Sequence, residues 1–333
     1  MIAKIMYLHY ISMDYMKYMV TMVLLLGVGF IYEKYKLSAL GDEDTRNYEL
    51  VKKYLVNDSS LAKSKLPILW IHLDYETNSR WWSSFNTRNS NDLNQPYLFL
   101  TIKSIIDKCG GDFNICVIDD DTYKNIVPGW NIDMARVADP IKSKLRKLAI
   151  ARLLKHYGGL VVPPSFLCMK SLASMYYTET CGGKMFAGEL LCDTSGADYT
   201  EVFISDRFMG APKNCEIIDQ YIQYLENLIS QDYTDESNFI GSTNRWLNMM
   251  YGENKIGCVS GQLLGCQDSE NKLVRIERIM GNTFIDFIPT VLGVLLPDKE
   301  ILSRSKYQWF ARLSSEQALE CNNIAGKLLL TAR

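Results

Sequence analysis

The alternation of apolar and polar residues is most informative between Ile141 and Cys168. Apolar residues recur at helical spacing as far as Tyr157, with lysine and arginine residues between them, so the pattern predicts a helix with one buried stripe. Gly158 and Gly159 follow, and a glycine pair allows the positive backbone angles that end a helix. Residues 160–162 are all apolar and predict a short buried strand. Together these features indicate half of an α/β crossover, in which ligands bind beyond the carboxyl ends of the strands.

Similar elements are predicted along the rest of the chain from Leu66 onwards. Apolar runs predict strands at 67–73, 113–118, 184–190 and 203–211, and helical spacing predicts helices at 97–108, 216–229, 239–251 and 314–330. The last helix has a capping-box pair, Ser314 and Gln317, at its start. We expect a strand pair, or a strand and a turn, within 283–296. The order of elements predicts an α/β fold, a Rossmann-like mixed sheet flanked by helices, in one domain over 66–333.

Residues 1–65 differ in composition from the predicted domain. Residues 18–32 are free of charge and flanked by lysines. The run is shorter than the roughly 20 residues of a typical membrane helix, but flanking lysines can lengthen the effective span. A cleaved signal peptide is the alternative, although no small-residue cleavage site follows. We therefore expect a single-pass N-terminal membrane anchor within 1–40 and a linker or stalk at 41–65, with the sidedness left open.

Composition limits the possible functions. The net charge of −2 over 333 residues gives no basic excess, which argues against nucleic acid as a partner. The nine cysteines stand singly and only three histidines are present, so neither a zinc site nor a disulfide framework is indicated.

The segment HYGGLVVPPS, residues 156–165, resembles the glycine-pair segment of the DXD-containing sugar-nucleotide glycosyltransferases. This group includes initiating mannosyltransferases and bacterial capsular-polysaccharide transferases. The resemblance implies a GT-A-like fold in which two aspartates at a strand end hold a divalent metal that clamps a sugar-nucleotide diphosphate. Alignment on the glycine pair puts Pro163 and Ser165 at those aspartates. The family's Asp and Arg in the preceding helix correspond to Lys147 and Ile150. The resemblance therefore implies the scaffold without its metal site, because these side chains supply no carboxylate.

Candidate functional residues come from strand ends and from the resemblance. An acidic residue at a strand end could act on an acceptor hydroxyl, or it could simply be solvated there. The candidates are Asp206 and Glu189 for catalysis, and Trp70, His72, Trp81, Arg146 and Ser165 for substrate binding.

The remaining metal candidate is the acidic run Asp119, Asp120 and Asp121, which follows a predicted strand. It would hold a divalent cation such as Mn²⁺ only if it replaced the missing aspartate pair. The alternative is that Asp121 or Thr122 caps the next helix. We otherwise expect no metal and no cofactor.

Two classes of function follow. The first is a membrane-anchored glycosyltransferase that moves a sugar from a nucleotide donor. The second is a catalytically degenerate relative that binds glycans or has a structural role. The segments LNQPYLFLTI, PGWNID and KYQWFARLS resemble proteins of large DNA viruses, and this resemblance implies a virion-associated assembly role with viral structural proteins as partners.

Overall fold

The computed structural model describes residues 66–74, 95–191, 202–231 and 241–332. All of them belong to one compact unit, whereas a second unit, Met1–Lys52, lies outside the described residues. The expected anchor at 18–32 and the linker at 41–65 also lie outside them. Within the described ranges, no helix combines the length and apolar character needed to cross a membrane.

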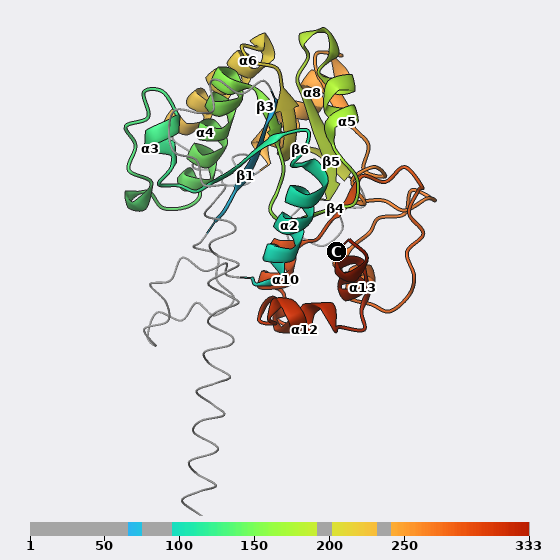
Figure 1. Ribbon diagram of the computed structural model, residues 1–333. Helices are drawn as coiled ribbons and strands as arrows, with labels where there is room; N and C mark the ends of the chain where they lie inside the picture. Colours follow the sequence, from blue (N-terminus) through green and yellow to red (C-terminus); the bar gives the residue numbers. More distant parts are fainter. Residues whose placement is uncertain (1–65, 75–94, 192–201, 232–240, 333) are drawn as a thin grey trace, which may run out of the picture. The chain divides into compact units, whose positions relative to one another are not determined.

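Six of the described strands form a mixed sheet in the order β2-β1-β3-β6-β5-β7, of which Figure 1 labels β1, β3, β6 and β5. β1 is parallel to both β2 and β3, β6 is antiparallel to both β3 and β5, and β7 is parallel to β5. The predicted α/β fold with a mixed sheet is therefore confirmed. The strands are β1 (Ile68–His72), β2 (Asn114–Ile118), β3 (Gly159–Val161), β5 (Phe186–Leu191), β6 (Val202–Ala211) and β7 (Gly257–Val259).

Gly158 and Gly159, the pair predicted to end the long helix, lie where neighbouring backbone leaves no room for a side chain. Gly158 and Gly159 have φ angles of 71° and 112°. A Cβ on Gly159 would lie 2.2 Å from the carbonyl oxygen of Ile68 in β1. The indole nitrogen of Trp70 donates a hydrogen bond to the Gly158 carbonyl at 3.0 Å. The helix end is thereby fixed against the neighbouring strand.

Helices on the sheet share one large apolar cluster. α4 (Ile141–Tyr157), α6 (Glu216–Ser230) and α8 (Ser242–Gly252) pack together with Trp70, Val161 and Met209 of the sheet. The predicted single buried stripe on α4 is wrong. Leu145, Leu148 and Leu153 are buried, but so are Lys142 and Lys144, because α4 packs against α6 as well as the sheet.

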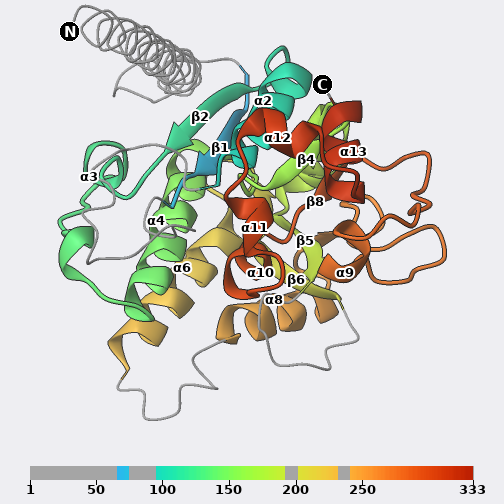
Figure 2. The same ribbon diagram turned by 90° about the horizontal axis from the view of Figure 1, so that it is seen from below.

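A second apolar cluster joins α2 (Tyr97–Cys109) to the C-terminal elements. β4 (Phe166–Cys168) pairs antiparallel with β8 (Gly293–Leu295), and Figure 2 shows α2 beside the C-terminal helices. The shorter helices are α3 (Tyr123–Ile126), η3 (Met134–Arg136), α5 (Ala173–Glu179), η4 (Cys181–Gly183), α9 (Ile276–Ile279), α10 (Asp298–Ser303), α11 (Gln308–Ala311), α12 (Ser315–Leu319) and α13 (Ile324–Thr331).

The expected single helix over 314–330 is wrong. The segment forms two helices, α12 and α13, and the side chain of Asn323 starts the second by accepting a hydrogen bond from the Gly326 amide at 2.8 Å. The predicted capping box of Ser314 and Gln317 is confirmed at the start of α12. Within 283–296, only Gly293–Leu295 forms a strand among the described elements.

Candidate functional site

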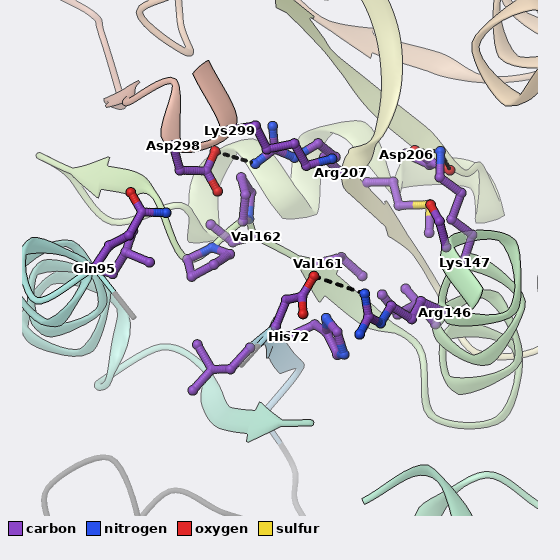
Figure 3. Close-up of a pocket in the computed structure, with 18 of the residues that line it drawn as sticks. His72, Gln95, Arg146, Lys147, Val161, Val162, Asp206, Arg207, Asp298 and Lys299 are labelled. Carbon is purple, nitrogen blue, oxygen red and sulfur yellow. Dashed lines mark hydrogen bonds and ion pairs between the residues drawn. The ribbon is translucent and has the colours of Figure 1, made fainter. Parts of the chain in front are cut away.

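A cavity of about 210 Å³ opens beyond the carboxyl ends of β1 and β3 (Figure 3). The chain passes from β1 to β2 on one side and later returns to β3 on the other, so the strand order reverses between β1 and β3. Open α/β sheets bind ligands at such a switch point. Residues 72–74 after β1 and 161–164 at the end of β3 line the cavity.

The cavity wall combines apolar surface with many charged groups. Its described lining includes four cationic side chains and three carboxylates. The cations are Arg146, Lys147, Arg207 and Lys299, and the carboxylates are Asp74, Asp206 and Asp298.

One charged cluster holds Arg146 at the cavity wall. Its guanidinium donates from Nη2 to Asp120 Oδ2 at 2.6 Å and from Nη1 to Asp74 Oδ2 at 2.9 Å. His72 Nε2 lies 3.1 Å from Asp120 Oδ1, and the His72 ring stacks on Tyr123 with centroids 5.5 Å apart. Burial raises the pKa of Asp120, but the hydrogen bonds from His72 and Arg146 outweigh it and hold that pKa below its usual range. The cluster therefore presents a fixed cation.

A second cluster holds Lys147 in the same way. Lys147 Nζ lies 2.8 Å from Asp206 Oδ2 and donates to Thr243 Oγ1 at 2.8 Å. The Tyr221 hydroxyl donates to Asp206 Oδ2 at 2.7 Å. Burial raises the pKa of Asp206, yet the Lys147 charge and these hydrogen bonds outweigh it, so the carboxyl pKa lies below its ordinary value. Asp206 is consequently an ionised partner of Lys147.

The opposite side of the cavity comes from elements distant in sequence. Arg207, on β6, donates from Nη2 to Asp298 Oδ1 at 2.9 Å, and Asp298 is the first residue of α10. Lys299 follows it, and Gln95 precedes α2. Figure 3 shows Arg207, Asp298 and Lys299 facing His72 and Arg146 across the space.

Three of the residues expected from the sequence reach this cavity: His72, Arg146 and Asp206. Of the four positions that the expected resemblance aligns with site residues, Lys147, Ile150 and Pro163 line the cavity, and Ser165 does not. A loop, a helix and two strand ends thus converge on one space.

Other expected site residues lie elsewhere. Trp70 is 1 % exposed and packs in the apolar core, so it offers no surface to a ligand. Ser165 is fully buried, and its hydroxyl has no hydrogen-bond partner within the described part of the chain. Glu189 accepts a hydrogen bond from the Gly261 amide at 2.9 Å and is not part of the described lining. Trp81 lies outside the described residues.

The acidic run after β2 does not act as a unit. Asp119 accepts a hydrogen bond from the Thr122 amide at 2.9 Å, Asp120 pairs with Arg146, and Asp121 is exposed. Thr122 occupies the N-cap position of α3, but its side chain makes no cap hydrogen bond. Among the described residues, no group of three histidine, cysteine or acidic side chains is arranged to hold a metal ion.

The sequence did not single out Gln95, Asp298 and Lys299. Gln95 and Asp298 each stand beside a proline at a helix start, which is a signal for a loop end and not for a ligand. Their proximity to β1 and β3 depends on the tertiary packing of α2 and α10.

A scan against protein-family models finds no match to this chain, and a search of curated proteins finds none either.

Proposed function

We propose that this protein is a glycosyltransferase-like, GT-A-like protein whose cavity binds a nucleotide sugar without a divalent cation. The observation that carries this proposal is the position of the cavity, at the β1/β3 switch point and against Lys147, Ile150 and Pro163. In the family that the segment 156–165 resembles, the aspartate aligned with Pro163 is one of the two that hold the metal, and the metal clamps the diphosphate.

Fixed cations would replace the metal's charge. A diphosphate needs a positive partner, and arginine binds phosphate oxygens through two parallel N–H donors. Arg146 and Lys147 are adjacent on α4, and acidic partners hold both at the cavity wall. Groups fixed in advance bind an anion without first reorganising. Lys147, which replaces the family's aspartate, therefore brings a positive charge to the position of a negative one.

A catalytically degenerate binding protein of the same fold is the second candidate. The contacts of Asp206, the acidic residue expected to serve as a base, favour this candidate. Its Oδ2 already accepts from Tyr221 and lies against Lys147, and a carboxylate with a lowered pKa is a weak base. Such a protein would bind the nucleotide sugar but would not transfer the sugar. A membrane anchor at 18–32 remains part of both proposals.

Both candidates bind a nucleotide sugar without a metal. Calorimetric titration of the full-length chain with UDP-glucose and GDP-mannose in EDTA tests this binding. We expect one of them to bind, and we expect Arg146→Gln and Lys147→Gln each to weaken it about tenfold through the loss of a charged hydrogen bond. Lys184→Gln, a matched change at an exposed residue, should leave the affinity unchanged. Equal affinity in all four proteins would contradict the proposal.

Incubation of the same protein with radiolabelled donor then separates the two candidates. Release of free sugar or transfer to an added glycan would favour the enzyme, and binding without turnover would favour the degenerate protein.

A further inference from the structure

The side of the cavity away from α4 has a buried amide that the described residues do not fully satisfy. Gln95 is 3 % exposed, and its Oε1 accepts a hydrogen bond from the Tyr97 hydroxyl at 2.8 Å. Burial raises the pKa of Tyr97 well above its ordinary value, so the phenol keeps its proton and remains the donor. The amide orientation is therefore set, and within the described residues its nitrogen has no acceptor. Figure 3 shows that nitrogen on the cavity side.

An acceptor oxygen lies across from this donor. Asp298 has a side chain that is 14 % exposed, and Arg207 occupies its Oδ1. Its second oxygen accepts no hydrogen bond from the described part of the chain and is directed into the same space in Figure 3. This oxygen faces the cavity and not the protein, so a donor on a ligand can pair with it in place of water. The wall thus offers an N–H donor and a carboxylate acceptor together.

This pair suits a hydroxyl group better than a phosphate. A hydroxyl both donates and accepts, so it can satisfy Gln95 and Asp298 at once. A phosphate oxygen at neutral pH only accepts, and the open Asp298 oxygen would repel it. Apolar side chains surround the pair, as is usual in sites that place a few polar groups in an apolar wall. These apolar neighbours are Leu98, Pro164 and Leu302.

We infer that Gln95 and Asp298 form a subsite for the hydroxyl groups of a neutral sugar. This inference rests on the proposed function, because the sugar would be the one carried by the nucleotide. The diphosphate would then contact Arg146 and Lys147 on the opposite wall. The cavity volume of about 210 Å³ is below the roughly 300–1,000 Å³ of sites that enclose a drug-sized ligand, so it fits the sugar end of the donor more readily than the whole molecule.

The test compares each sugar nucleotide with its parent diphosphate, by calorimetry on the full-length chain in EDTA. The probes are UDP and UDP-glucose, and GDP and GDP-mannose. For the pair that binds, we expect the sugar nucleotide to bind the unaltered protein about tenfold more tightly than its diphosphate, the effect of roughly one well-made hydrogen bond. Gln95→Met and Asp298→Asn should each remove that advantage and leave the affinity for the diphosphate unchanged.

Controls separate this inference from the proposed function. Gln223→Met makes the same chemical change at an exposed position of α6 and should behave like the unaltered protein. Asp298→Asn preserves side-chain volume, so it tests the subsite even if Gln95→Met unfolds. Equal affinity of the unaltered protein for sugar nucleotide and diphosphate, or equal weakening of both by the variants, would overturn the sugar subsite alone. No binding of any nucleotide would overturn the proposed function as well.

Discussion

Gly159 stands where β3 begins, next to the backbone of β1. Its φ angle of 112° is one that residues with a side chain rarely adopt, and an added Cβ would lie 2.2 Å from the Ile68 carbonyl oxygen. Backbone atoms cannot move aside without breaking the β1–β3 pairing that positions the cavity. The glycine is therefore required by both conformation and space.

We expect Gly159→Ala to lower the free energy of unfolding by at least about 2 kcal/mol, because strain and a backbone clash add together. Urea unfolding measures the change. Gly111→Ala is the matched control, since Gly111 has no atom within 4 Å of an added Cβ. A Gly159→Ala protein as stable as the control would contradict the packing described for the start of β3.

The Asp120 carboxyl gives a pH-dependent prediction. Its folded pKa lies below the ordinary value of 3.8, so its contribution to stability is complete above about pH 4 and is lost as the pH falls through the folded pKa. Asp120→Asn should reduce the free energy of unfolding by about 2 kcal/mol at pH 7. The difference from the unaltered protein should shrink below pH 4.

Unfolding curves at pH 7, 5 and 3 measure that difference. Asp121→Asn, at the exposed neighbouring residue, should have little effect at any of these values. A difference for Asp120→Asn that stayed constant down to pH 3 would show that the carboxylate is not held ionised by His72 and Arg146.

Residue patterns predicted one half of the site better than the other. Lys147 and Pro163 could be placed because the glycine pair gives a local reference within the same helix and strand. Gln95 and Asp298 could not, since their place in the cavity lining depends on contacts between α2, α10 and β6 that no local pattern encodes. Trp70 misled because an aromatic residue inside a strand packs in the core as readily as it contacts a ligand.

At the scale of elements, long segments with one apolar stripe were predicted within a few residues. α6 is an example: it was predicted at 216–229 and spans Glu216–Ser230, with Ile218, Leu225 and Leu228 on its buried side. The C-terminal segment was harder, because the apolar spacing of α12 and α13 reads as one helix. The break depends on Asn323, whose side chain accepts a hydrogen bond from the Gly326 amide and thereby starts a new helix.

The capping box of α12 gives a prediction for one element. Ser314→Ala should lower the free energy of unfolding by about 1 kcal/mol, because the Ser314 hydroxyl accepts from the Gln317 amide at 3.2 Å. Thermal unfolding measures the effect. Ser303→Ala, at the exposed end of α10, is the control. Equal melting temperatures for the two variants would argue against the capping box.

At the scale of the whole molecule, the α/β class follows from alternating strands and helices, but the sheet order does not. The chain leaves β1 for β2 and returns to β3 on the other side. This reversal places residues after β1 and β3 in one space together with α4, β6 and α10. We propose that the fixed cations of this space do for a diphosphate what a divalent ion does in the family that the sequence resembles.

Calorimetric titration of the full-length chain with UDP-glucose and GDP-mannose, in EDTA and again in manganese, tests that claim most directly. Both carboxylate oxygens of Asp206 already accept hydrogen bonds, from Lys147 and Tyr221, and the described residues hold no group of three metal-ligating side chains, so a metal would gain few ligands there. We predict that one sugar nucleotide binds with the same dissociation constant in both buffers. Binding that occurs only with manganese, or binding in neither buffer, would contradict the account.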